Sequence, residues 1–254
     1  QFINQLDKSL NIKNYNDLHN WSIKQKNEFW SNVWDFTNFV GEKKGKIFKS
    51  APEFTNNKFF DECKINYAEN CLTRDDDDDA IIFHSEKKIK RNYSWKELKS
   101  AVLKFTNYLK NNNIEKNDRI AAILPSIPET VISFLSTAQL GAIWSSCSSD
   151  FGKKAIIDRF KQIEPKVLLF SDYYFYNNKK VDTTKVIKDV IYNIPSIEKI
   201  ILIPYEFIET DYQLDFEYDN LYNILQQEIE YSKFEKFNFN HPLYILYSSG
   251  TTGV

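Results

Sequence analysis

Six small residues at the end of the chain have the composition of a loop that binds phosphate. They are Ser248, Ser249, Gly250, Thr251, Thr252 and Gly253, and we call them the Ser/Thr loop. The two glycines allow backbone amides to approach a bulky anion closely, and the four hydroxyl groups can donate hydrogen bonds to phosphate oxygens. The loop is not a Walker A motif, because it contains no lysine. It predicts a polyphosphate site of another kind, although a flexible linker has the same composition.

The place of the Ser/Thr loop in the chain favours a binding site over a linker. An apolar, strand-like run covers residues 243–247 and leads directly into the loop. A second polar loop, SSCSSDFG at residues 145–152, also follows a strand-like run and carries Ser148, Ser149 and Asp150. In open parallel sheets, ligands bind beyond the carboxyl ends of the strands. Both loops are therefore candidates for the functional site.

The elements that must position these loops alternate from residue 80 onward. Apolar runs at residues 118–125, 142–146, 166–172 and 198–204 are typical of buried strands, and amphipathic segments between them are typical of helices. A capping box of Ser94 and Glu97 starts the first helix, and Gly141 ends the second one. This alternation predicts an α/β fold with a doubly wound, largely parallel sheet whose strands are joined by helical crossovers.

The first 79 residues differ from the rest of the chain. Aromatic and aliphatic side chains recur at largely helical spacing between residues 21 and 36, which predicts a helix with a packing face. We expect Ser22 to cap the start of this helix and Gly41 to end it. The run of five aspartates at residues 75–79 lacks the glycine turn and the closing glutamate of a calcium loop. It predicts a solvated loop at a boundary, with no metal site.

Composition excludes several classes of protein. The formal net charge of -2 among 254 residues gives no electrostatic reason to expect nucleic acid or an anionic membrane as a partner. No apolar run is long enough to cross a bilayer, and no signal peptide is visible.

Cys63, Cys71 and Cys147 lack metal-binding spacing and predict reduced thiols in a cytoplasmic protein. Because the chain contains no methionine, we expect it to be part of a longer protein.

The sequence YSSGTTG at residues 247–253 resembles the phosphate-binding signature of the acyl-adenylate-forming enzymes. That superfamily includes acyl-CoA synthetases, luciferases and the adenylation domains of peptide synthetases. Its motif continues with one residue, a proline and a lysine, and only Val254 represents this continuation here. The resemblance implies that the Ser/Thr loop holds the β- and γ-phosphates of ATP. A small carboxylate would attack the α-phosphorus in the presence of Mg²⁺, and the thiol of CoA would then displace AMP to form a thioester.

Further segments narrow the resemblance to short-chain acyl-CoA synthetases. The stretches at residues 21–36 and 65–72 resemble the N-terminal extension of those enzymes. The resemblance implies an extension, mainly helical, over residues 1–79, followed at residues 80–254 by the first part of the AMP-binding domain, cut within the phosphate-loop motif.

The substrate branch is indicated by residues 138–152. Their sequence, AQLGAIWSSCSSDFG, looks most like the branch that activates acetoacetate, because acetate-activating enzymes usually carry a glycine pair where this chain has Ser149 and Asp150. In relatives this loop comes close to CoA, which implies the same for Ser148, Ser149 and Asp150. A purely structural turn is the alternative.

Relatives bind adenine, ribose and Mg²⁺, and complete catalysis with a lysine of a mobile C-terminal domain, through residues further along the chain. No catalytic residue is assigned here, and we expect this chain by itself to be inactive. Acetate- or propionate-activating enzymes stay open as alternatives. So do a non-catalytic nucleotide-binding relative and a non-adenylating α/β protein whose Ser/Thr loop is a linker.

Overall fold

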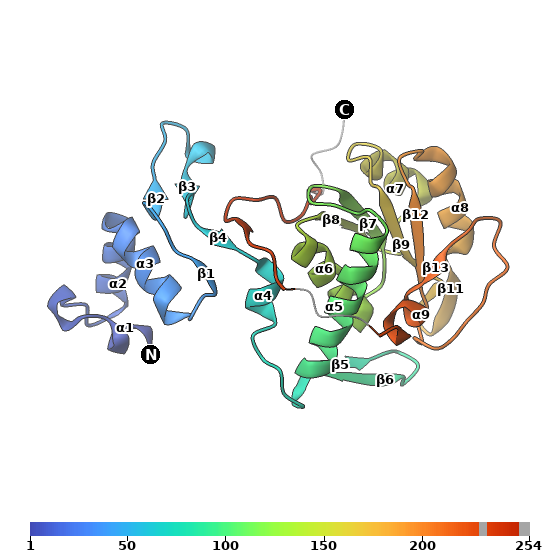
Figure 1. Cartoon of the computed structure of the whole chain (residues 1–254), viewed down its shortest axis with the longest axis horizontal. Helices are drawn as coiled ribbons and strands as arrows, with labels where there is room; N and C mark the ends of the chain where they lie inside the picture. The colour runs from blue at the N-terminus through green and yellow to red at the C-terminus, as the bar shows by residue number, and fades with distance from the viewer. Residues whose placement is uncertain (229–232, 249–254) are drawn as a thin grey trace. The chain divides into compact units, whose positions relative to one another are not determined.

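A computed structural model of the chain describes residues 1–228 and 233–248. The chain divides into two compact units, which Figure 1 shows coloured from blue to red along the sequence. The first unit comprises Gln1–Asn70 and Phe234–His241, and the second comprises Cys71–Lys233 and Pro242–Val254. All of the Ser/Thr loop except Ser248 lies outside the described residues.

The first unit consists of short helices and small antiparallel sheets. Its helices are α1 (Phe2–Gln5), α2 (Tyr15–Lys24), α3 (Lys26–Phe36) and α4 (Tyr67–Cys71), with 3₁₀ turns at Lys8–Leu10 and Phe54–Asn56. One sheet has the strands β1 (Gly41–Glu42), β4 (Lys64–Ile65) and β14 (Phe237–Asn238), and the other has β2 (Phe48–Lys49) and β3 (Lys58–Phe59). Strand β14 comes from late in the sequence and pairs with β4, so a distant segment completes this unit.

The helix predicted from the aromatic spacing is in fact two helices, and both of its predicted ends are wrong. Ser22 lies inside α2, where its hydroxyl donates to the carbonyl of His19 at 2.8 Å. The cap of α2 is Asn14, whose side chain accepts a hydrogen bond from the amide of Asp17 at 3.1 Å. Gly41 does not end α3 but lies in β1, where an added Cβ would meet the carbonyl of Lys64 at 2.8 Å. Glycine is needed there because the strands approach closely.

The second unit is built around a parallel sheet of five strands. These are β7 (Arg119–Ile123), β8 (Ile143–Cys147), β9 (Val167–Ser171), β12 (Lys199–Ile203) and β13 (Asp219–Asn220), in the spatial order β13-β12-β9-β7-β8. Every neighbouring pair in this sheet is parallel. The order reverses between β7 and β9, which makes this point the topological switch point of a doubly wound sheet. The predicted α/β fold class is confirmed.

Helices cover the two faces of this sheet (Figure 1). On one face α5 (Trp95–Asn111) packs against α6 (Pro128–Leu140) and α9 (Leu221–Gln226), and on the other α7 (Lys153–Phe160) packs against α8 (Thr184–Asn193). Alternate side chains of the central strands β7 and β9 join the core under α7 and α8. Burial on both faces explains why these strands read as continuous apolar runs.

Two antiparallel hairpins accompany the sheet. The first has the strands β5 (Asp79–His84) and β6 (Lys90–Ser94), and the second has β10 (Tyr173–Tyr176) and β11 (Lys179–Asp182). Strand β6 leads directly into α5 through the predicted capping box of Ser94 and Glu97, which is confirmed. Gly141 ends α6 in the left-handed conformation, with φ of 74°, also as predicted. None of the helices in the described ranges has the length and apolar composition needed to span a membrane.

Candidate functional site

One predicted loop follows β8, and the other follows residues 243–247, which form no strand of the sheet as predicted but a single parallel bridge beside β8. Residues 243–247 run beside β8, with Tyr244 paired in parallel to Trp144. The amide of Trp144 donates to the carbonyl of Leu243 at 3.1 Å, and the amide of Ile245 donates to the carbonyl of Trp144 at 2.8 Å. Because β8 and this segment point the same way, Ser148 and Ser248 emerge at the same carboxyl edge of the sheet.

The loop after β8 is a short turn. The amide of Phe151 donates to the carbonyl of Ser148 at 3.1 Å, and the side chains of Ser148 and Asp150 are exposed. The hydroxyl oxygen of Ser149 is buried and has no hydrogen-bond partner among the described residues. A role of Ser148, Ser149 and Asp150 near CoA stays a prediction, as does phosphate binding by the Ser/Thr loop.

A buried ion pair lies where the chain leaves β7 and enters α6. Glu129, the second residue of α6, is fully buried, and Arg91 of β6 binds it through Nη1 to Oε1 at 2.5 Å and Nη2 to Oε2 at 3.0 Å. The hydroxyl of Tyr93 donates to the same carboxylate at 2.8 Å. Burial, and then the negative charge of Glu129, raise the pKa of Tyr93 strongly, so its hydroxyl keeps its proton.

Asp172 forms a second buried centre directly after β9. Its Oδ1 accepts hydrogen bonds from the amides of Tyr173 at 2.9 Å and Tyr205 at 2.8 Å, and its Oδ2 accepts one from the hydroxyl of Tyr212 at 2.8 Å. Burial raises the pKa of Asp172 although these hydrogen bonds oppose the shift. Arg91 also donates to the carbonyl of Tyr205 at 3.2 Å, so one continuous polar network joins the ends of β7, β9 and β12.

This network was missed in the sequence. In the sequence, Arg91 has the pattern of an ordinary strand residue and Glu129 that of an ordinary residue in a first helical turn. Asp172 has the pattern of a polar residue that ends a strand. The network lies at the switch point between β7 and β9, where ligands of doubly wound sheets commonly bind. In this chain the side chains of the network bridge the switch point. The part of the sheet edge beside β8 is therefore the better candidate for ligand binding.

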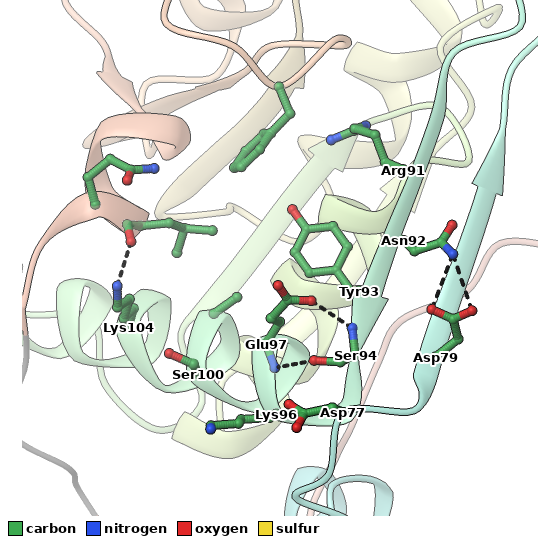
Figure 2. Close-up of a pocket in the computed structure, with 14 residues that line it drawn as sticks. Asp77, Asp79, Arg91, Asn92, Tyr93, Ser94, Lys96, Glu97, Ser100 and Lys104 are labelled. Carbon is green, nitrogen blue, oxygen red and sulfur yellow. Dashed lines mark hydrogen bonds between the residues drawn. The ribbon is translucent and has the colours of Figure 1, made fainter.

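A groove of about 960 Å³ lies beside the first hairpin, between β6, α5 and the end of α9 (Figure 2). Several polar groups that line it are already bonded to each other. Figure 2 shows the reciprocal bonds of Ser94 and Glu97, at 2.8 and 3.2 Å, and the bond from Lys104 to the carbonyl of Leu225 at 2.8 Å. Among the residues that the structure describes, the groove lining includes neither Ser248 nor Ser148, Ser149 and Asp150.

The acidic run before β5 is balanced by neighbouring cations. Arg74 binds Asp76 at 2.8 Å and also binds Asp78, and Lys99 binds Asp75 at 3.0 Å. Within residues 1–228 and 233–248, no group of three or more His, Cys, Asp or Glu side chains could hold a metal ion.

A doubly wound sheet with polar loops at one carboxyl edge is typical of α/β proteins that bind nucleotides. The chain belongs to the AMP-binding enzyme family, whose family model matches residues 68–254. It is 36% identical over 249 residues to acetoacetyl-coenzyme A synthetase of Rhizobium meliloti (strain 1021), covering 94% of this chain and 37% of that protein. It is 33% identical to acetoacetyl-CoA synthetase of Xenopus tropicalis, covering 100% of this chain and 40% of that protein.

A solved structure gives the same family relationship. Acetoacetyl-CoA synthetase from Streptomyces lividans is similar with a TM-score of 0.86 at 30% identity, over 95% of this chain and 37% of that chain. The chain therefore spans about two fifths of the length of these relatives. These findings confirm the resemblance to the adenylate-forming acyl-CoA synthetases that residues 138–152 and 247–253 indicate.

Proposed function

We propose that this chain is the N-terminal part of an ATP-dependent acyl-CoA ligase that activates a short-chain carboxylate, with acetoacetate as the substrate. The observation that carries this proposal is the parallel pairing of Tyr244 with Trp144, which directs Ser148 and Ser248 to one edge of the sheet. An enzyme that first adenylates an acid and then transfers it to CoA needs its phosphate loop and its CoA loop within reach of one carboxylate. Membership of the AMP-binding family supports the same chemistry.

In this proposal the Ser/Thr loop holds the β- and γ-phosphates of ATP. Its amides and hydroxyls would stabilise most strongly the charge that develops on the departing pyrophosphate, because preorganised donors need no rearrangement during the reaction. The substrate carboxylate attacks the α-phosphorus, pyrophosphate leaves, and an acyl-adenylate forms. The CoA thiol then attacks the acyl carbon and AMP leaves, giving the thioester. Ser148, Ser149 and Asp150 would lie beside the incoming CoA.

Magnesium enters this scheme only as the ion that accompanies ATP. No group of three or more His, Cys, Asp or Glu side chains among the described residues could hold a metal ion. We also propose that residues 1–79 are the extension of short-chain synthetases, that residues 80–254 are the first part of the AMP-binding domain, and that the protein is cytoplasmic. The reaction needs residues beyond this chain, so we expect the isolated chain to form no thioester.

Acid-dependent exchange of labelled pyrophosphate into ATP tests the proposed function. The whole protein that contains this chain is assayed with acetoacetate, acetate, propionate or no added acid. The expected result is the fastest exchange with acetoacetate. Faster exchange with acetate or propionate would keep the mechanism and replace the substrate. No exchange with any of the acids would contradict the ligase and favour a non-catalytic relative.

A further inference from the structure

The side chain of Arg159 contacts two aromatic rings, those of Phe151 and Tyr247. Its guanidinium carbon is 5.0 Å from the ring centre of Phe151, which directly follows the loop residues Ser148, Ser149 and Asp150. The same carbon is 5.8 Å from the ring centre of Tyr247, which directly precedes the Ser/Thr loop. One cation therefore contacts the aromatic residue at the base of each loop.

Two hydrogen bonds reinforce this arrangement. The hydroxyl of Tyr247 donates to the backbone carbonyl of Arg159 at 2.5 Å, and Nη1 of Arg159 donates to the carbonyl of Ala155 one turn earlier in α7 at 2.8 Å. Helix α7 is itself held by Ile156 and Phe160, which are fully buried in the core under the sheet. The guanidinium is thus fixed to a well-packed helix, and Tyr247 is fixed to the same helix turn.

We propose that Arg159 is a positioning residue that sets the distance between the Ser/Thr loop and the loop after β8. It touches neither phosphate nor CoA in this proposal. It acts through Tyr247 on the phosphate loop and through Phe151 on the CoA loop. Its catalytic consequence rests on the proposed function, because the two loops matter together only if ATP and CoA react at one site.

Arginine suits this role better than lysine. A planar guanidinium can stack on two rings and still donate along its edge, whereas an ammonium group is a compact point charge on a flexible stem. Replacing Arg159 by glutamine removes both contacts of the cation with the rings. We expect the poorer placement of each loop to raise the Michaelis constant of its ligand, ATP or CoA, by about threefold to tenfold.

Kinetic measurements distinguish the contact of Arg159 with Tyr247 from its contact with Phe151. In the whole protein, Arg159→Gln is expected to raise KM for ATP in pyrophosphate exchange and also KM for CoA in thioester formation. Tyr247→Phe removes only the hydroxyl and is expected to raise KM for ATP alone, whereas Phe151→Leu is expected to raise KM for CoA alone. Arg159→Lys should recover part of both effects. The control is Lys154→Gln, an exposed residue of α7 that contacts neither ring in the described structure.

Amide hydrogen exchange tests the placement without catalysis. In the Arg159→Gln protein, peptides covering residues 147–152 and 243–248 should both exchange faster than in the wild type and in Lys154→Gln. Unchanged exchange in either peptide would overturn the bridging role. A lower thermal midpoint with both KM values unchanged would also overturn it, because Arg159 would then only stabilise α7. If the wild type exchanges no pyrophosphate, the proposed function fails, while hydrogen exchange still decides whether Arg159 positions the loops.

Discussion

Arg91 and Glu129 form an ion pair in which the carboxylate is completely buried and the guanidinium side chain is 16% exposed. The pair joins β6 of the first hairpin to the start of α6, with one hydrogen bond from each Nη atom to a different carboxylate oxygen. Arg91 also reaches the carbonyl of Tyr205 at 3.2 Å, and the rings of Phe83 and Phe207 flank its guanidinium at 5.2 and 5.6 Å. A single cation therefore holds together segments that are far apart in the sequence.

Removing one partner of this pair should destabilise the protein strongly. Glu129→Gln leaves the Arg91 cation without its counter-charge in a buried setting, which costs about 3 to 5 kcal/mol. The measurement is the urea midpoint of the whole protein. Lys99→Gln is the control, because it breaks the more exposed pair with Asp75, which is worth less than about 1 kcal/mol. Equal midpoint shifts for the two variants would contradict the assigned role of the buried pair.

Loss of one hydroxyl from the Ser/Thr loop should slow adenylation. We expect Thr251→Ala to reduce pyrophosphate exchange by about ten- to a hundredfold, since a hydrogen bond to a charged group is worth about 1.5 to 3 kcal/mol. The assay uses the whole protein with its preferred acid. Thr55→Ala, which removes the same group from an exposed residue of the first unit, should leave the rate unchanged. Normal exchange by Thr251→Ala would argue against phosphate binding by this threonine.

The buried carboxyl of Asp172 should give the stability a defined pH dependence. Burial raises its pKa above the ordinary value of 3.8, so the folded state binds a proton more readily than the unfolded state. The contribution of Asp172 to stability is therefore fully present below the unfolded pKa, and it is lost as the pH rises through the folded pKa. Asparagine cannot titrate. The urea midpoint of the wild type, relative to that of Asp172→Asn, should fall as the pH is raised from about 4 towards neutrality.

Asp215, whose pKa is lowered and not raised, provides the control for this titration. A hydrogen bond from Lys188 lowers the pKa of the exposed Asp215, so the contribution of that carboxylate is present above its unfolded pKa and is lost as the pH falls. The difference between the wild type and Asp215→Asn should therefore have the opposite sign of slope, reduced by solvent screening. A wild type that gains stability relative to Asp172→Asn as the pH rises would refute the effect of burial.

The cysteines should differ in reactivity. Burial raises the pKa of Cys147 to about 11, so roughly one molecule in a thousand carries the thiolate at pH 8. Cys63 is buried as well, and its thiol donates to the carbonyl of Lys44 at 3.3 Å, whereas Cys71 is half-buried. A thiol reagent should therefore label Cys71 first, and Cys147 should react at a comparable rate only after unfolding. Peptide mass spectrometry locates the label, and equal labelling of Cys71 and Cys147 in the native protein would disprove this order.

Local signals in the sequence correctly predicted most of the second unit. The reciprocal bonds of Ser94 and Glu97 join residues three positions apart, and Gly141 ends α6 through its own backbone conformation. Features of this kind can be derived from the sequence without knowing which distant segments pack against them. The same approach failed in the first unit, where the aromatic spacing continues across the break at Gln25 and conceals the end of α2.

The sequence by itself therefore determined the α/β class, the places of the main helices and strands of the second unit, and the polar loop after β8, because short-range hydrogen bonding and hydrophobic periodicity carry that information. Only the tertiary structure decided which strand lies beside residues 243–247, that β14 pairs with β4, and that Arg91 binds Glu129. These contacts join distant segments, and their partners are selected by the packing of the whole unit. The contacts of Arg159 with both loops follow from the same packing.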